Sequence, residues 1–202
     1  STGASVSVRP AVGCDYSTMP MAYDLWILIP VFNDWTAVAL LLESLDRTLA
    51  QQYMRADVLL VNDGSSVRCP ERLYAGGGVA VRQVRILHLR RNLGHQRAIA
   101  VGLAFLHSEM KGEAVVIMDG DGEDRPEEIP RLVERFRQEQ GRRIVFAART
   151  KRLEGLLFQV LYLLYRWLHR LLVGMQVRVG NFSIVPWADL STLVVSSEIW
   201  SH

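Results

Sequence analysis

Short apolar runs alternate with segments of helical periodicity along most of the chain, and this alternation limits the folds that the chain can adopt. The apolar runs have strand character and lie at residues 25–29, 58–61, 84–89, 115–118 and 144–148. Between them, apolar residues recur every three or four positions, which predicts helices at 34–49, 95–108 and 132–140. Strands that alternate with helices in this way form a mostly parallel sheet that is covered by helices. We therefore expect an α/β fold.

Polar loops follow four of the predicted strands. They comprise residues 30–34, 63–66, 92–97 and 119–124. In an open α/β sheet, ligands bind outside the carboxyl ends of the strands. These loops are therefore expected to meet at one edge of the sheet and to form the functional site.

The loop after the fourth apolar run is the most informative of them. Three acids, Asp119, Asp121 and Glu123, fall within five residues, and they repel one another unless a cation or a cluster of donors neutralises them. Oxygen ligands suit Mg²⁺ or Mn²⁺, and Mg²⁺ usually takes one or two carboxylates together with substrate phosphates. The loop therefore predicts a divalent-metal site and, through the metal, a nucleotide diphosphate as partner.

A solvated acidic turn is the alternative explanation of the same loop. Pro126 suits the first turn of a helix, Asp124 suits its N-cap, and the two glutamates after Pro126 suit its positive end. We expect this capping to occur, but it leaves Asp119 and Asp121 unexplained. The metal site is therefore predicted in addition to the cap.

Composition limits the function classes. The chain has 202 residues, of which 50% are hydrophobic, and a net charge of +2. These values fit one globular domain and argue against disorder and against a broad nucleic-acid surface. Cys14 and Cys69 form neither a disulfide framework nor a metal-spaced cluster, which is compatible with a reducing compartment.

Residues 1–22 lack apolar periodicity, so we expect a flexible N-terminal segment and not a signal sequence. The end at Ser201 and His202, directly after a helical pattern, is what an excerpt of a longer chain would show.

The polar loops also carry motifs in a fixed order. The motifs are Pro-Val-Phe-Asn-Asp at 30–34, Val-Asn-Asp-Gly-Ser-Ser at 61–66, Asn-Leu-Gly-His-Gln-Arg-Ala at 92–98 and Met-Asp-Gly-Asp-Gly-Glu-Asp-Arg-Pro at 118–126. With these motifs, over about residues 25–184, the chain resembles the family 2 glycosyltransferases of the GT-A fold. Within that family it is most similar to the dolichol-phosphate mannosyltransferase-like and polyprenyl-phosphate glycosyltransferase branch. Each motif is weak by itself, but four in this order are specific.

The resemblance implies a Rossmann-like GT-A fold, with a mostly parallel sheet flanked by helices and a C-terminal amphipathic helical region. On this basis, residues 23–152 are expected to be the nucleotide-sugar-binding core. Residues 153–202 are expected to form an amphipathic interface helix and the acceptor side of the same domain.

The resemblance also implies a nucleotide site. Pro30, Val31 and Asp34 would line the base pocket, where the family more often has Glu in place of Asp34. Asp63 would accept a hydrogen bond from the nucleobase, although turn formation by its own side chain is the alternative. Asp119 would lie near the ribose and the metal.

The same resemblance assigns metal and phosphate contacts. Asp119 and Asp121 would bind Mg²⁺ or Mn²⁺, and Glu123 would be a third ligand at a position where relatives often carry Gln. Asp121 is then catalytic through the metal, which stabilises the charge of the departing diphosphate. Arg149 matches an arginine that the family uses near phosphate, as a catalytic and acceptor-phosphate residue. A solvated basic patch with its basic neighbours is the alternative for Arg149.

The acceptor decides whether the reaction needs a general base. An alcohol acceptor needs one, whereas a lipid phosphate is already anionic and mainly needs desolvation and positioning. The base candidates Asp189, Glu198 and His202 are equally explained as exposed helix residues. His95 and His107 are expected to be helix-end or surface histidines and not catalysts.

Residues 155–174 bear on the acceptor. The segment is apolar, but Arg166, His169 and Arg170 interrupt it, so a transmembrane span is not expected. Its pattern favours a helix in the membrane interface whose arginines meet lipid phosphates. A core helix, or a surface that packs on further parts of a longer protein, is the alternative.

One departure from the family concerns residues 177–184. Many mannosyltransferase-like relatives have an Asp-containing stretch that leads to Gly-Phe-Arg, whereas this chain has Gly-Asn-Phe at 180–182. The missing acid puts the donor sugar and the acceptor in doubt, and it makes Arg178 a candidate acceptor-phosphate contact.

Together these expectations describe a metal-dependent, inverting glycosyltransferase, with its stereochemistry taken from the resemblance alone. It would move a sugar from a UDP- or GDP-linked donor to a dolichyl- or undecaprenyl-type phosphate. It would act at the cytoplasmic face of a membrane, as a peripheral protein or attached through segments absent from this chain, without a nucleic-acid partner. The alternatives are a glycosyltransferase for saccharide or protein hydroxyls and a catalytically silent nucleotide-sugar-binding domain.

Overall fold

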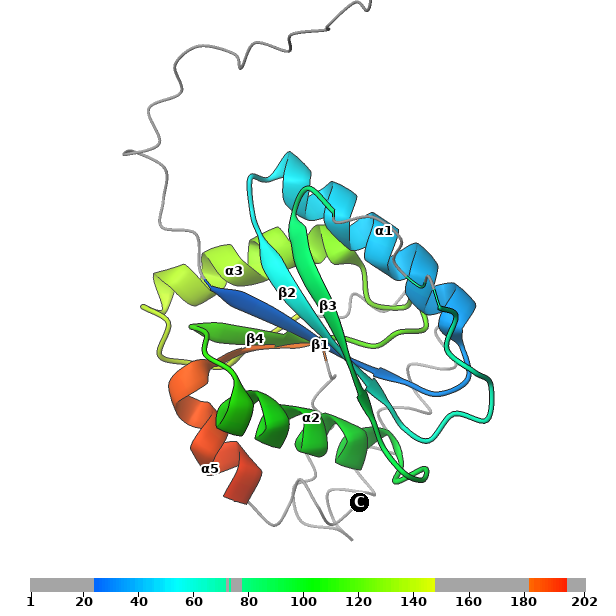
Figure 1. The fold of residues 1–202 in the computed structure, drawn as a ribbon. Helices are drawn as coiled ribbons and strands as arrows, with labels where there is room; N and C mark the ends of the chain where they lie inside the picture. Colours follow the sequence, from blue (N-terminus) through cyan, green and yellow to red (C-terminus); the bar gives the residue numbers. More distant parts are fainter. Residues whose placement is uncertain (1–23, 72, 74–77, 148–181, 196–202) are drawn as a thin grey trace, which may run out of the picture.

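The computed structural model describes residues 24–71, 73, 78–147 and 182–195 (Figure 1). Its elements, in chain order, are β1 (Leu25–Val31), α1 (Trp35–Gln51), β2 (Ala56–Asn62), β3 (Val81–His88), α2 (His95–Glu109), β4 (Ala114–Ile117), η2 (Pro126–Glu128), α3 (Ile129–Gln138), β5 (Val145–Phe146), β6 (Ser183–Pro186), η3 (Trp187–Asp189) and α5 (Leu190–Val195). Every predicted strand and helix between residues 25 and 146 is present, and the ends differ from the predicted ones by a few residues.

The strands form one sheet with the order β3-β2-β1-β4-β6-β5. β3, β2, β1 and β4 are parallel, whereas β6 is antiparallel to both of its neighbours, β4 and β5. The predicted mostly parallel sheet is confirmed, and β6 is a strand that the sequence did not predict. Its four residues include Ile184 and Val185, but the run is too short for a periodic pattern and ends in Pro186, which has no N–H for the ladder.

Each strand directs alternate side chains to the two faces of the sheet. Leu25, Ile27 and Ile29 of β1 pack in one core with α1 and α3, while Trp26 and Leu28 pack in a second core with α2 and α5. The helices accordingly form two layers, with α1 and α3 on one face and α2 and α5 on the other (Figure 1). Because both faces are covered, β1 and β2 are buried along their whole length, and β1 is a continuous apolar run.

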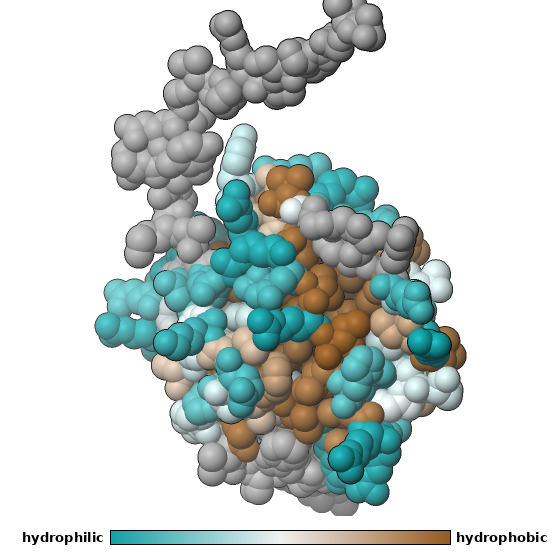
Figure 2. Space-filling model, viewed as in Figure 1, coloured by the Kyte–Doolittle hydropathy of each residue, from teal (hydrophilic) through white to brown (hydrophobic). Residues whose placement is uncertain are grey.

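β3 is the edge strand next to β2 in the described sheet. Figure 2 shows a band of apolar residues between hydrophilic ones in the region of this strand. Val84 and Ile86 contact the core of α1 and α3, and Leu87 and Leu89 contact the core of α2 and α5, each of them partly buried. The edge strand therefore contributes to both cores.

Two predicted regions lie outside the described residues. They are the N-terminal segment 1–22 and the amphipathic segment 155–174, so the predicted division of the chain at residues 152 and 153 stays a prediction. In the part of the chain that the structure describes, no helix has the length and apolar character needed to cross a membrane.

Candidate functional site

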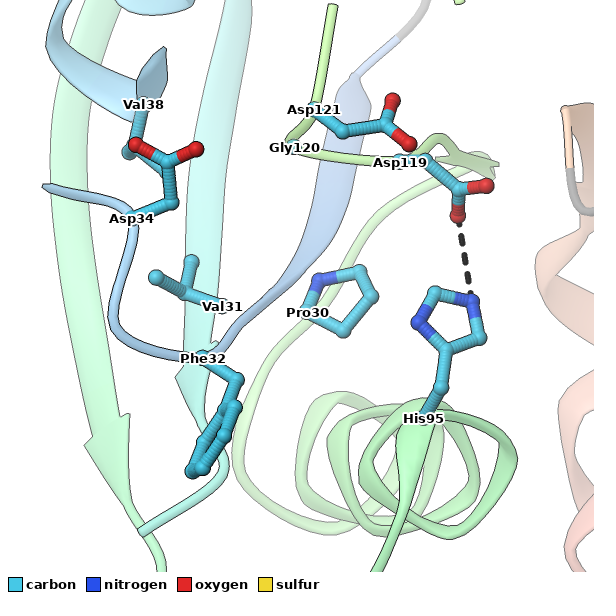
Figure 3. A pocket seen from close by; sticks show the side chains of 9 residues that line it. All are labelled: Pro30, Val31, Phe32, Asp34, Val38, His95, Asp119, Gly120 and Asp121. Carbon is cyan, nitrogen blue, oxygen red and sulfur yellow. Dashed lines mark ion pairs between the residues drawn. The ribbon is translucent and has the colours of Figure 1, made fainter. Parts of the chain in front are cut away.

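A pocket of about 320 Å³ lies at the carboxyl ends of β1 and β4, beside the first turn of α2 (Figure 3). Its lining residues are Pro30, Val31, Phe32, Asp34, Val38, His95, Asp119, Gly120 and Asp121. β1 and β4 are neighbours in the sheet, but the chain leaves β1 through α1 on one face and reaches β4 through α2 on the other. Such a switch point opens a crevice at the carboxyl ends of the strands, where α/β sheets bind ligands. Five of the residues predicted for the nucleotide and the metal lie together in this crevice.

The first wall of the pocket is the end of β1 and the turn into α1. Phe32 is 51% exposed, although it is a large apolar residue. Asp34 is the N-cap of α1, and its carboxylate accepts a hydrogen bond from the Ala37 N–H at 3.0 Å. Asp34 therefore caps a helix and lines the pocket with the same side chain.

The acidic loop, residues 119–124, forms the second wall of the pocket. It brings two carboxylates there because it folds back on itself. The Met118 N–H still donates to the backbone of β1, so the loop begins at Asp119. The Asp119 N–H then donates to Asp124 Oδ2 at 2.8 Å, and the Glu123 N–H donates to Asp121 Oδ1 at 2.9 Å. Local bonds of this kind fix a turn without regular secondary structure. They hold Asp119 and Asp121 at the same pocket wall.

Gly120 lets the acidic loop pass close to the end of β1. A Cβ at this position would lie 3.2 Å from Ile29 Cγ2 and 3.3 Å from the carbonyl oxygen of Pro30. Both distances are tighter than ordinary van der Waals contact, so a Cβ here would require its neighbours to shift by a few tenths of an ångström. The residue between the two acids is thus restricted by packing.

The predicted role of Asp124 as a helix cap is wrong. The following helix begins as η2, with Arg125 at the N-cap position and no side-chain cap. Asp124 is 3% exposed, and its carboxylate accepts the Asp119 N–H. A carboxylate buried to this extent needs hydrogen-bond donors, and the Asp119 N–H supplies one. Pro126 and the two glutamates after it do occupy the first turn, as expected.

His95 is a pocket residue that the sequence did not identify as one. It is the first residue of α2, as expected for a helix-end histidine, but its Nε2 lies 3.1 Å from Asp119 Oδ1 (Figure 3). The hydrogen bond with Asp119 raises the pKa of His95 above its ordinary value; burial opposes this increase, and the negative charges around the ring add to it. Val115 and Ile117 pack against α2, and Asp119 continues on their side of the strand. That alternation is visible in the sequence, but the position of α2 is not.

Asp63 is buried and is not among the residues that line the pocket. Its Oδ1 accepts the Leu93 N–H at 2.7 Å and its Oδ2 accepts the Gly94 N–H at 3.0 Å, which ties the loop after β2 to the start of α2. The turn that the sequence offered as the alternative is made by Asn62, whose Oδ1 accepts the Ser65 N–H at 3.0 Å. Because each carboxylate oxygen can accept more than one hydrogen bond, base binding by Asp63 stays a prediction.

Asn33 ties the loop after β1 to the loop after β2. Its backbone is left-handed, with φ of 65°, a conformation that Asn adopts more readily than most residues. Its Oδ1 accepts hydrogen bonds from Ser66 Oγ at 3.1 Å and from the Val67 N–H at 3.0 Å, and its own N–H donates to Ser65 Oγ at 2.9 Å. The pocket residues on either side of Asn33 are thereby anchored to the neighbouring loop.

Asp119 and Asp121 are the pocket carboxylates that a metal would meet. Glu123 is not among the lining residues, and no three His, Cys, Asp or Glu side chains of the described residues gather as a metal cluster. Mg²⁺ seldom uses a complete protein cage, because phosphate oxygens and water complete its coordination. Two carboxylates therefore fit Mg²⁺ or Mn²⁺ bound together with a diphosphate. The role of Glu123 as a third ligand stays a prediction.

Two further candidates in the described residues, Asp189 and His107, lie outside the pocket lining. Asp189 lies in η3, beyond the end of β6 that pairs with the start of β4, so it is at the opposite edge of the sheet from the pocket. His107 is exposed in the last turn of α2, as expected for a surface histidine. The predicted residues outside the described part of the chain are Arg149, Arg178, Glu198 and His202.

Comparisons with known proteins agree in the family that they indicate. A family model described as Glycosyl transferase family 2 matches residues 26–184. The chain is 31% identical over 162 residues to the uncharacterized glycosyltransferase YkcC of Bacillus subtilis, covering 79% of this chain and 48% of that protein. It is 34% identical over 133 residues to the undecaprenyl-phosphate 4-deoxy-4-formamido-L-arabinose transferase of Photorhabdus laumondii, covering 64% of this chain and 38% of that protein. The chain thus spans less than half the length of these two relatives.

Solved structures show a similar fold. S. aureus TarS in complex with UDP-GlcNAc matches with a TM-score of 0.52 and 15% identity, covering 84% of this chain and 47% of that chain. Glucosyl-3-phosphoglycerate synthase from Mycobacterium tuberculosis, in complex with Mn²⁺, UDP-Glc and phosphoglyceric acid, matches with a TM-score of 0.53 and 18% identity, covering 82% of this chain and 57% of that chain. At these identities the likeness is one of fold alone.

Proposed function

The chain belongs to glycosyl transferase family 2 and has the GT-A fold, and we propose that it moves a sugar from a nucleotide diphosphate sugar to a polyprenyl phosphate in a metal-dependent reaction. The observation that carries the proposal is the pocket at the β1–β4 switch point, where Asp119 and Asp121 lie opposite Pro30 and Val31. A nucleotide diphosphate needs this combination, because its base takes an apolar wall and its phosphates take oxygen-bound metal.

The base end of the proposed donor site is the wall formed by the end of β1. Pro30 and Val31 offer an apolar surface, and the exposed ring of Phe32 can stack on a flat base. Asp34 adds a hydrogen-bond acceptor at the same wall, and Asp63 would accept from the base. Both UDP- and GDP-linked donors fit this chemistry; the two solved structures named above contain UDP-sugars, which supports UDP as the first nucleotide to test.

The metal end of the proposed site is the acidic loop. When bound, Mg²⁺ or Mn²⁺ would neutralise charge on the departing diphosphate. Asp121 and Asp119 would hold the ion, Asp119 also lying near the ribose, and Asp121 would thereby be catalytic. The bonds that fold the acidic loop fix the main chain at Asp119 and the carboxylate of Asp121 before the donor arrives, which lowers the reorganisation that the reaction requires.

The acceptor is proposed to be a lipid phosphate, as the name of the Photorhabdus relative says of that protein. An anionic phosphate needs no general base. Among the base candidates named from the sequence, Asp189 is the one in the described residues, and it lies at the far edge of the sheet. Arg149 and Arg178 are the proposed acceptor-phosphate contacts. We further propose inverting stereochemistry and a location at the cytoplasmic face of a membrane, with residues 155–174 in the interface.

The proposal is tested by measuring nucleotide diphosphate release and lipid product with Mn²⁺, UDP- and GDP-linked sugars, and undecaprenyl phosphate. Turnover is expected to require both the metal and the lipid phosphate. Removal of a group that stabilises developing charge typically costs about 100- to 1000-fold, so Asp121→Ala should lose at least about 100-fold. Glu71→Ala is the control, because this acid is 88% exposed and is not among the pocket-lining residues.

Other outcomes would contradict the proposal in distinct ways. Turnover with a saccharide or protein hydroxyl, and no dependence on lipid phosphate, would establish a transferase of the alternative class. Tight nucleotide binding with equally inert parent and Asp121→Ala proteins would identify a catalytically silent binding domain.

A further inference from the structure

We propose that His95 is a positioning residue that orients the Asp119 carboxylate for the metal, an inference that rests on the proposed function. The His95 Nε2 lies 3.1 Å from Asp119 Oδ1, with side-chain exposures of 42% and 15% for the two residues. Both side chains line the pocket, and Figure 3 shows the imidazole directed at the carboxylate from the end of α2. The contact joins the loop at residues 92–97 to the acidic loop at residues 119–124.

The position of His95 is itself determined by the preceding backbone. Gly94 has φ of 91° and ψ of 151°, a conformation that is essentially restricted to glycine, and α2 begins directly after it. The Leu93 and Gly94 N–H groups donate to the two oxygens of Asp63, a buried carboxylate that follows β2. The start of α2, and the imidazole at its first position, are therefore anchored to the sheet.

Asp119 is held at both its main chain and its side chain. Its backbone N–H donates to Asp124 Oδ2 at 2.8 Å, which fixes the main chain, and His95 contacts its side chain. A carboxylate that ligates a metal is typically oriented by a hydrogen bond from an outer residue, because the bond selects one rotamer. His95 supplies that bond, so one oxygen of Asp119 is directed to α2 and the carboxylate plane is set before the metal binds.

The series of contacts also connects the two ends of the proposed donor site. Asp63, a proposed base contact, anchors the loop that begins α2; His95 extends from α2 to Asp119, a proposed metal ligand. Each step is a hydrogen bond between neighbouring loops. A change at His95 should therefore weaken metal binding while the fold remains intact.

The experiment measures Mn²⁺ binding, alone and with UDP, from the loss of the spin-resonance signal of hydrated Mn²⁺. Loss of an outer-shell partner typically lowers metal affinity by about 10- to 100-fold, and this is expected for His95→Ala. His95→Gln should recover most of the affinity, because its amide nitrogen reaches about as far as Nε2 and can donate. His107→Ala is the matched control, an exposed histidine in the last turn of the same helix.

Each outcome decides the inference. If His95→Ala binds Mn²⁺ as tightly as the parent while Asp121→Ala does not, the positioning role is wrong and the proposed metal site stands. Tighter binding by His95→Ala would show that the imidazole competes with the ion, which also overturns the inference. If the parent with UDP binds no Mn²⁺, the proposed function and the inference fall together. A merely structural role is excluded when circular dichroism and melting match the parent and the Gln variant restores affinity.

Discussion

The acids at the amino ends of the parallel strands are held differently from those at the carboxyl ends. We call these two ends of the sheet the amino edge and the carboxyl edge. At the amino edge, Arg82 of β3 donates to both oxygens of Asp57, at 3.0 and 2.8 Å, and also to Asp24. At the carboxyl edge, Asp119 contacts the imidazole of His95, and the carboxylates of the acidic loop accept backbone N–H groups. A guanidinium remains charged and matches a carboxylate in a two-bond geometry, whereas an amide orients a carboxylate and leaves most of its charge in place. The first arrangement suits structure, and the second suits a site that binds an external cation.

The largest expected effect comes from removing one acid at the carboxyl edge. Asp119→Asn keeps the shape of the side chain but removes its charge. An outer-shell partner of a metal is typically worth up to about 100-fold in affinity, so a direct ligand should be worth at least about 100-fold. Titration of Mn²⁺ in the presence of UDP should show this loss, while the denaturation midpoint stays close to that of the parent.

The matched change at the amino edge should have the opposite profile. Asp57→Asn leaves Arg82 with Asp24 as its remaining carboxylate in this cluster. Breaking a buried pair costs about 3–5 kcal/mol, but the Arg82 side chain is 41% exposed, so we expect about 1–3 kcal/mol of unfolding free energy. Mn²⁺ affinity should not change. If Asp57→Asn weakened Mn²⁺ binding, or if Asp119→Asn mainly destabilised the fold, the distinction between the two edges would be wrong.

The length and local pattern of each element decided how much of the fold could be predicted. The apolar pattern identified β1 to β5 and the helices α1, α2 and α3, because these segments were separated by turn residues. β6 was missed because its four residues are too few for a periodic pattern, and its pairing with β4 and β5 depends on distant parts of the chain.

The site was predictable to the extent that it follows the ends of strands. Asp119 and Asp121 follow β4 and Pro30 and Val31 end β1, so the rule for parallel sheets was sufficient to bring them together. His95 was not predictable, because its contact depends on the face of the sheet that α2 covers. The error about Asp124 has a similar cause, since local sequence favoured a cap and burial against the Asp119 amide overrode it.

Gly64 tests whether the carboxyl edge also depends on close backbone contact. A Cβ on Gly64 would lie 2.4 Å from the carbonyl carbon of Arg91 and 2.5 Å from the nitrogen of Asn92, and its φ is +66°. Strain and overpacking together predict a loss of about 2–3 kcal/mol of unfolding free energy for Gly64→Ala. Gly122→Ala is the control, because its φ is +83° but nothing lies within 4 Å of the added Cβ. Denaturant unfolding should show the larger loss for Gly64→Ala; equal losses would mean that conformation alone matters.

Substitutions of Asn33 test whether hydrogen bonds between loops stabilise the fold at the carboxyl edge, as the ion pairs of Arg82 do at the amino edge. Asn33→Ala removes two acceptor contacts and keeps the unfavourable φ of 65°, so we expect a loss of about 1–2 kcal/mol of unfolding free energy. Asn33→Gly removes the same contacts but adopts that φ without strain, so its loss should be smaller. An Asn33→Gly protein as stable as the parent, with unchanged UDP affinity, would show that the tie between the loops contributes nothing measurable.

Asp34 gives the smallest expected effect and the sharpest separation of structure from binding, because one carboxylate caps α1 and lines the pocket. Asp34→Ala should lose about 1 kcal/mol of unfolding free energy, the usual contribution of an N-cap, whereas Asp34→Asn should keep the cap and the stability. If the carboxylate also contacts the nucleotide, Asp34→Asn should bind UDP or GDP more weakly than the parent at equal stability. Calorimetric titration of both nucleotides, beside denaturant unfolding, makes this comparison. If the Asp34→Asn protein matches the parent in both measurements, the role of Asp34 is structural, like that of Asp57, although Asp34 lies at the opposite edge of the sheet.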